Sequence, residues 1–224
     1  MTTAADTASD PTATRILDVA ERLVQMRGFN DFSYADIAAE VGITKASLHY
    51  HFATKAELGR RLVIRYAESF AAALRRIDAS SADPGRRLRA YVGLYADVLA
   101  GQRMCLCGMV AAEYATLPHP MQAAIRAFFE LNESWVAMQF DQCARAGALA
   151  AAVTPLNAAR TLVGALEGEM LVARAYGDPA RFEAAARLLL TQLMGAEPAV
   201  PNARRTHRSA RKAQGPLRAA RRRS

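Results

Sequence analysis

A dense group of hydrogen-bond donors stands between a glycine-containing turn and the next acidic residue, Glu57. The donors are Lys45, Ser47, His49, Tyr50, His51 and Lys55. Cationic, hydroxyl and imidazole groups of this kind are common partners of phosphate oxygens. The segment therefore suits the backbone of a nucleic acid. The alternative is that the two lysines are solvated charges and that Tyr50 and Phe52 are aromatic residues of the core. For Phe52 we prefer the core position.

Two short helices on either side of a four-residue turn must position these donors. The turn is formed by residues 41–44, in which Gly42 permits a backbone conformation that a side chain opposes and Thr44 can cap the following helix. An earlier helix, over about residues 12–26, has apolar residues at three- and four-residue spacing. Two short helices packed on a preceding one form a helix-turn-helix, whose second helix enters the major groove of DNA.

Helical periodicity continues along the rest of the chain, and neither a strand signal nor an internal repeat stands out. Beyond residues 12–26, 33–40 and 45–51, helices are predicted over about 54–79, 84–101, 103–116, 121–146, 155–176 and 179–194. We therefore expect an all-α fold of about nine helices. A helix-turn-helix domain at 12–58, with a linking helix at 54–79, precedes a larger helical domain at 59–195. Disordered ends are expected at 1–11 and 196–224.

The net charge of +8 is located mainly at the C-terminal end. Residues 204–224 hold nine Arg or Lys and no acid, so the remainder has 20 basic and 21 acidic residues. The charge therefore does not by itself indicate nucleic-acid binding by the folded body. It does leave an alternative function open, a nucleic-acid-binding protein without sequence preference that depends on the arginine-rich tail.

Several classes of protein are disfavoured by what the sequence lacks. It contains no apolar run of the roughly 18 residues that a membrane helix needs, and residues 1–11 do not resemble a secretory signal. An odd number of cysteines, three, favours a reducing cytoplasm. We find no phosphate-binding glycine loop, nucleophile elbow or zinc motif. The expectation is a protein that is not an enzyme and that needs no cofactor or metal.

Two segments near the N-terminus, FNDFSYADIA at residues 29–38 and GITKASLHYHFATKAEL at residues 42–58, resemble the N-terminal pattern of the TetR family of repressors. His49 stands where the family usually has Tyr, and Ala46 where it often has Gly. The resemblance implies phosphate contacts by Ser33, Tyr34, Thr44, Tyr50, His51 and Lys55. It implies base reading by Lys45, Ala46, Ser47 and His49. A Lys that reads guanine contributes about 1–3 kcal/mol of discrimination, so Lys45 is expected to set sequence preference.

A second segment, ALEGEMLVARA at residues 165–175, resembles the penultimate helix of many TetR-family members, which forms a dimer interface with the last helix. Gly164 and Gly168 lie four residues apart on one helix face, although such glycines also serve packing within one subunit. The interface residues expected are Gly164, Gly168, Leu171, Leu189 and Leu193. A twofold dimer would read a near-palindromic operator.

Aromatic and methionine side chains accumulate in the central helices and suit an adaptable apolar pocket for a small molecule. The candidates are Tyr91, Tyr95, Met104, Cys105, Cys107, Met109, Phe128, Phe129, Trp135, Met138 and Phe140. Each of them can equally be ordinary core. Glu113 is a candidate to orient the ligand, unless it faces solvent or pairs with Arg126.

Cys105 and Cys107 are two residues apart and are expected on different helix faces, so that one of them can meet solvent or ligand. A low-pKa thiolate beside Arg103 would be open to oxidation or alkylation. Some members of the TetR family, which this chain resembles, sense electrophiles through a cysteine at the start of this helix. The alternative for this chain is that both thiols are buried. The function expected is a dimeric repressor, or else an activator, that leaves its operator when a small molecule or electrophile changes the spacing of its two DNA-binding domains.

Overall fold

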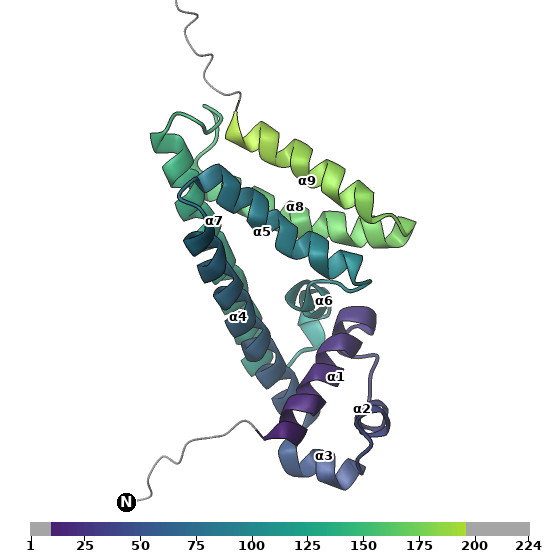
Figure 1. The fold of residues 1–224 in the computed structure, drawn as a ribbon. Helices are drawn as coiled ribbons and strands as arrows, with labels where there is room; N and C mark the ends of the chain where they lie inside the picture. Colours follow the sequence, from purple (N-terminus) through teal and green to yellow (C-terminus); the bar gives the residue numbers. More distant parts are fainter. Residues whose placement is uncertain (1–9, 196–224) are drawn as a thin grey trace, which may run out of the picture.

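The computed structural model describes residues 10–195, and over this range the chain forms nine α-helices, one short 3-10 helix and no strand (Figure 1). The helices are α1 (Pro11–Arg27), α2 (Tyr34–Val41), α3 (Lys45–His51), α4 (Lys55–Ser80), α5 (Pro84–Ala100), α6 (Leu106–Ala112), the 3-10 helix (Tyr114–Thr116), α7 (His119–Arg145), α8 (Pro155–Tyr176) and α9 (Pro179–Met194). The all-α prediction is confirmed. Disorder was expected for residues 1–11 and 196–224. It is wrong for Asp10, which caps α1, and for Pro11, which begins that helix, and the rest of these two ranges lies outside the described residues.

Local signals set the ends of the first helices. Ser33 and Asp36 form a capping box at the start of α2, and Gly42 ends that helix with a φ of +75°, a conformation that side chains oppose. The Thr44 hydroxyl accepts a hydrogen bond from the Ser47 amide at 3.1 Å and so caps α3. Thr54 caps α4 in the same way through the Glu57 amide.

The helix-turn-helix is formed by α1, α2 and α3 around a small apolar core. Ile16, Ile37, Leu48 and Phe52 are fully buried in it. Phe52 is therefore a core residue, as preferred from the sequence. Since Leu48 points inward from the middle of α3, the opposite face of that short helix is turned outward.

The larger domain is formed mainly by α4, α5, α7, α8 and α9. Helix α4 leaves the helix-turn-helix and runs along α7, while α8 packs against both α7 and α9 (Figure 1). Helix α6 lies between the helix-turn-helix and the larger domain and contacts α1, α4 and α7. Its position gives it contacts with both domains.

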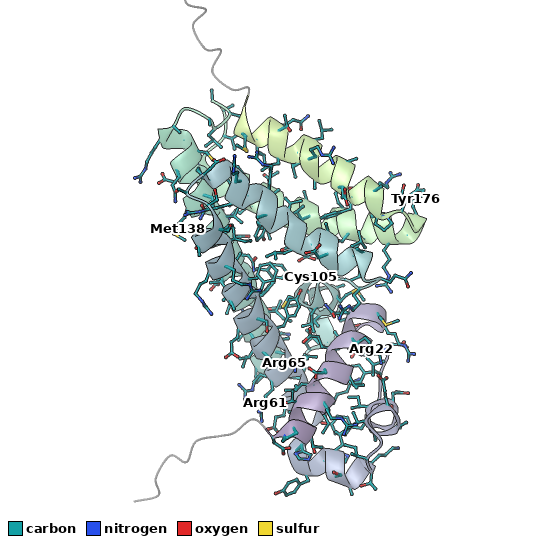
Figure 2. The ribbon with its side chains drawn as sticks, in the orientation of Figure 1. Arg22, Arg61, Arg65, Cys105, Met138 and Tyr176 are labelled. Atoms are coloured by element: carbon teal, nitrogen blue, oxygen red, sulfur yellow. The ribbon has the colours of Figure 1, made fainter. Side chains whose placement is uncertain are left out.

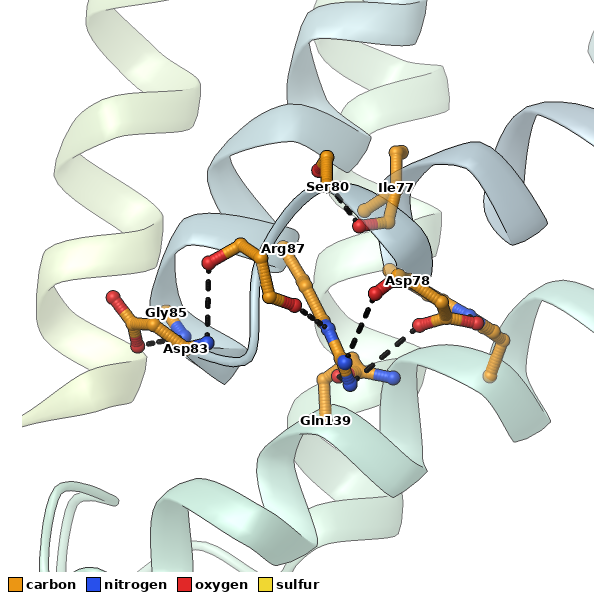
Figure 3. A network of polar contacts seen from close by, with 9 residues as sticks. Ile77, Asp78, Ser80, Asp83, Gly85, Arg87 and Gln139 are labelled. Atoms are coloured by element: carbon orange, nitrogen blue, oxygen red, sulfur yellow. Dashed lines mark hydrogen bonds and ion pairs between the residues drawn. The ribbon is translucent and has the colours of Figure 1, made fainter.

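A polar network fixes the corner where α4 ends and α5 begins (Figure 3). The Arg87 guanidinium donates to the carbonyls of Ser81 at 2.7 Å and Asp78 at 3.1 Å, and to the side chain of Gln139 on α7 at 3.3 Å. The Trp135 indole donates to Asp78 at 3.0 Å. This end of α4 is therefore held to both α5 and α7.

The predicted helix over residues 103–116 is shorter in the structure than expected. The Met104 amide donates to the carbonyl of Gln25 in α1 at 3.2 Å, so residues 104 and 105 stay outside the helix. Helix α6 starts at Leu106 with Cys105 as its N-cap, and Glu113 separates it from the 3-10 helix. A contact distant in sequence thus sets this helix start.

Candidate functional site

The outward face of α3 carries most of the side chains that were expected to read bases. Thr44, Lys45, Ala46 and His49 are exposed, and Ser47 is half-buried. Tyr50 is the most exposed large hydrophobic residue of the described chain, at 87%. The alternative that Tyr50 is a core aromatic is therefore wrong. Its ring and the Lys45 ammonium are available to a partner outside the protein.

Tyr34 and Lys55 point inward, contrary to the expectation that both contact phosphates. The Tyr34 hydroxyl donates to the carbonyl of Phe52 at 2.9 Å, and burial raises the pKa of Tyr34 to about 12. The Lys55 ammonium donates to the carbonyl of Phe32 and lies 4.2 Å from the centroid of its ring. Desolvation by burial lowers the pKa of Lys55. In this structure both side chains connect elements of the helix-turn-helix with one another.

Three further residues that were expected to contact phosphates or bases have partners within the protein. His51 Nδ1 lies 3.0 Å from a carboxylate oxygen of Asp10, the residue that caps α1. His49 Nδ1 lies 3.2 Å from the carbonyl oxygen of Ala53. The Ser33 hydroxyl donates to Asp36 at 2.7 Å in the capping box of α2. Of these three, His49 on α3 and Ser33 at the start of α2 are exposed, whereas His51 is half-buried.

The interior of the larger domain holds most of the residues expected to line a ligand pocket. Those buried together in its core are Tyr91, Tyr95, Met104, Cys105, Cys107, Phe128, Trp135 and Phe140, while Met109 and Phe129 are half-buried against it. Met138 is 55% exposed and lies at the outer edge of α7 (Figure 2), so its assignment to the pocket is wrong. Helical phase explains the error, since Met138 is two residues from each of the buried Val136 and Phe140 and therefore points away from their face.

Hydrogen bonds cross this core, although its walls are largely apolar. The hydroxyls of Tyr91 and Tyr95 are 3.0 Å apart, and the Tyr91 hydroxyl donates to Asn132 at 3.0 Å. Phe70 packs against both tyrosines, with ring centroids 6.1 Å and 6.0 Å away. The core therefore combines aromatic faces with a short chain of polar groups.

Both cysteines of interest are buried, which agrees with the alternative that the sequence left open and contradicts an arrangement with one thiol toward solvent. Cys105 is the N-cap of α6 and is not inside the helix, so the helical phase assumed for it does not apply. Burial, and then the nearby Glu167 carboxyl, raise the pKa of both thiols well above the usual value. The low-pKa thiolate expected beside Arg103 is therefore wrong for this structure.

Glu167 of α8 is a functional candidate that the sequence did not single out. Burial raises the pKa of its carboxyl to about 7, against a smaller opposing effect of the hydrogen bond from the Cys105 thiol. A Cβ atom on Gly108 would overlap Oε2 of Glu167, so the glycine makes room for the carboxyl. The buried Leu162, Leu166, Met170 and Ala173 of α8 set a helical phase that could have placed Glu167 beside the core.

Glu113 faces the helix-turn-helix, so the expectation that it orients a ligand in the interior is wrong. It accepts a hydrogen bond from the Asn30 amide at 2.9 Å, and a Cβ atom on Gly28 would overlap its Oε1. The Asn30 side chain donates to Thr116 at 3.0 Å. Arg126, the alternative partner, donates instead to the Tyr114 hydroxyl. Glu113 therefore fastens the end of α6 to the loop between α1 and α2.

An exposed face of α8 and α9 carries most of the residues expected at a dimer interface. Gly164, Gly168 and Leu171 are exposed, and Leu188 beside them on α9 is 60% exposed. A Cβ atom on either glycine would meet nothing within 4 Å, so packing within one subunit does not explain them. Leu189 is half-buried. Leu193 packs into the core of its own subunit, which contradicts its assignment to this face.

The part of the chain that the structure describes has no helix long and apolar enough to cross a membrane. Within residues 10–195 no group of three or more His, Cys, Asp or Glu side chains is arranged to hold a metal ion. The exposed α3 face, the interior around Glu167 and the α8–α9 face are the candidate sites in the described residues.

Two family models match the chain. One is described as bacterial regulatory proteins of the tetR family and covers residues 16–62, and the other, a tetracyclin repressor-like C-terminal domain, covers residues 84–189. No curated protein matches the chain.

Solved structures similar to this one cover most of both chains. A TetR-family transcriptional regulator from Agrobacterium tumefaciens is 33% identical, with a TM-score of 0.79 over 82% of this chain and 98% of that one. A TetR regulator from Legionella pneumophila is 29% identical, with a TM-score of 0.74 and the same coverages. The reduced form of E. coli NemR, at 20% identity, has a TM-score of 0.72 over 84% of this chain and 100% of that one, and shares the fold.

Proposed function

Since the chain belongs to the TetR family of bacterial transcriptional regulators, we propose that α3 reads its operator and that the interior around Glu167 receives its effector. Regulators of this family are ligand-responsive DNA-binding repressors that act as dimers, and this chain is one of them. The observation that carries the residue assignment is the outward face of α3, where Lys45 and Tyr50 extend beyond the buried Leu48.

On this proposal, base edges are read by the exposed side chains of α3, namely Lys45, Ala46, Ser47 and His49. Tyr50 and Thr44 contact phosphates on either side, because hydroxyl groups and helix N-terminal amides are common phosphate donors. Lys55, His51 and Tyr34 act from within, by fixing the orientation of α3 relative to α1, α2 and α4. Phosphate contacts position the protein, whereas base contacts specify the sequence.

The dimer is proposed to form through the exposed face of α8 and α9. Glycines at 164 and 168 allow two α8 helices to approach closely, and Leu171 and Leu188 supply apolar surface around them. A twofold axis through this face places one helix-turn-helix on either side. The operator is then a near-palindrome whose half-sites lie in successive major grooves.

The effector is proposed to bind without forming a covalent bond to a thiol. A reactive electrophile would need an ionised Cys105, but burial and the Glu167 carboxyl both oppose ionisation there. A small molecule among Tyr91, Tyr95 and Phe128 needs no such step. This favours the non-covalent alternative of the two that the sequence left open.

A nucleic-acid-binding function that depends on the arginine-rich tail is not favoured, because the helix-turn-helix itself supplies an exposed reading face. The tail lies outside the described residues. Selection of bound sequences from a random duplex pool tests the proposal, with the full chain, a chain that ends at Gly195 and the Lys45→Ala variant. A palindrome recovered by the first two and altered at one position per half-site by the third is expected. Loss of all preference on tail deletion would overturn the proposal.

A further inference from the structure

An acidic side chain in the interior of the effector domain lacks the partners that a buried carboxyl needs. Oε1 of Glu167 is buried and has no hydrogen-bond partner among the described residues. Glu167 also forms no ion pair with any basic residue there. Buried acceptors without partners are rare in folded proteins, and an exception calls for an explanation such as an unseen ligand.

From these contacts we infer that Glu167 is the anionic anchor for an organic cation, an ammonium or amidinium group carried on an apolar body. This inference deepens the proposed function, because it names the chemistry of the effector for the same interior site. A cation supplies the missing opposite charge. A cation that carries N–H bonds also supplies the donor that Oε1 lacks, whereas a quaternary ammonium supplies the charge alone.

Among the described residues, no basic side chain forms an ion pair with the Glu167 carboxyl or shifts its pKa. The ionisable groups that interact with Glu167 or with its thiol neighbours are Glu21 (α1), Tyr66 (α4), Tyr91 and Tyr95 (α5), and Cys105 and Cys107 (at α6). Glu133 (α7) interacts in turn with Tyr91. All of them are acids or groups that are neutral at pH 7. The site is therefore electrostatically suited to a cation and unsuited to an anion.

Aromatic rings next to these groups match the apolar body of such a ligand. Tyr66, Phe70 and Phe128 pack together with ring centroids 5.3 to 6.3 Å apart, and Phe70 continues the cluster to Tyr91 and Tyr95. The faces of phenol and phenyl rings attract ammonium and guanidinium groups when they are desolvated. Tyr66, Tyr91 and Tyr95 of this cluster also interact electrostatically with Glu167, so aromatic side chains lie near the carboxyl. Such surroundings suit an alkyl or aryl ammonium.

Gly108 provides the means to test the geometry separately from the charge. Its missing side chain is the space that Oε2 of Glu167 occupies, so a methyl group there must displace the carboxyl. The Gly108→Ala variant keeps the acid and moves it. Glu169 lies on the same helix, is half-buried and serves as a matched control for loss of an acid.

Binding of a cation at this site should depend on pH, because only the ionised carboxyl pairs with it. With a pKa of about 7, Glu167 is largely neutral below neutrality. The affinity for a permanently charged ligand should therefore fall by about tenfold for each pH unit well below that value. Benzyltrimethylammonium carries such a charge at every pH used.

The experiment measures calorimetric binding to the full chain of benzyltrimethylammonium, benzylammonium, benzyl alcohol and benzoate. We expect the cations to bind and the neutral and anionic probes to bind at least about tenfold more weakly, the ratio that loss of one charged contact commonly gives. Glu167→Gln and Gly108→Ala should lose the cation preference, and Glu169→Gln should keep it.

Three results would overturn the inference. They are binding of benzyl alcohol as tight as that of either cation, no binding of a cation at millimolar concentration, and unchanged cation binding by a folded Glu167→Gln variant. The thermal unfolding of each variant, recorded first, shows whether it is folded. Operator selection by the same wild-type chain separates the two conclusions, since a selected palindrome without cation binding refutes only the ligand class.

Discussion

Replacing Glu167 by Gln should make the unfolding free energy of this protein less sensitive to pH. The pKa of the carboxyl is about 7 in the folded chain and 4.5 in its ordinary state. Below pH 4.5 both states hold the proton, and the buried group costs nothing. As the pH rises, the unfolded state releases its proton first, so wild-type stability falls until the folded group has also ionised.

The size of the effect follows from the two pKa values. One pKa unit corresponds to about 1.4 kcal/mol, so the interval from 4.5 to about 7 corresponds to roughly 3 kcal/mol at pH values above both. Relaxation of the core around the charge would reduce this, and the estimate is therefore an upper value. The Gln variant has no proton to release and should not show this loss.

Urea unfolding of the full chain at about pH 5 and about pH 8 measures the difference. The wild type and Glu167→Gln share all other titrating groups, whose contributions cancel when the two are compared at each pH. Glu169→Gln is the control for loss of another acid from α8. The gap between Glu167→Gln and the wild type should widen by up to about 3 kcal/mol between the two pH values. An unchanged gap would refute the assignment of a buried, high-pKa carboxyl.

Three further predictions concern the other surfaces. Lys45→Ala should lose about 1–3 kcal/mol of discrimination at one base pair of each half-site, measured by fluorescence anisotropy on matched and mismatched operators; equal losses on every sequence would contradict base reading. Gly168→Leu should leave the subunit folded and yield monomers in sedimentation equilibrium, and a persisting dimer would place the interface elsewhere. Arg87→Ala should cost about 1–3 kcal/mol in urea unfolding, because the corner carbonyls and Gln139 lose a charged donor, whereas a neutral effect would show that water replaces it.

The helix-turn-helix could be predicted because its determinants are local. Ser33, Gly42 and Thr44 act within three or four residues of their own positions, as caps or as a turn glycine. The same is true of the buried Leu48 and Phe52, whose spacing follows from the helix. The all-α class and most helix bounds were predicted on this basis.

Residue orientation was not predicted where it depends on contacts that are distant in sequence. Lys55 turns inward because a carbonyl and two rings from residues 29 and 32 receive its ammonium group. Cys105 is buried and outside α6 because Gln25 in α1 holds the neighbouring amide. In both places the local sequence allowed two orientations of the side chain, and the tertiary contact determines which of them forms.

The position of α6 also bears on how an effector signal reaches the DNA. A change in the spacing of the two DNA-binding domains was expected, and α4 is the helix that links the two domains of the chain. The far end of α4, however, is fixed to α5 and α7 by Arg87 and Trp135. Helix α6 instead has Gly108 against Glu167 and is followed directly by Glu113, which holds the amide of Asn30. A ligand that moves the Glu167 carboxyl therefore acts on α6 directly. A movement of α6 then reaches the loop between α1 and α2 through the hydrogen bond between Glu113 and Asn30. This route through α6 predicts that loss of the Glu113 contact with Asn30 uncouples effector binding from DNA release. The affinity for the effector and the affinity for the operator should each persist.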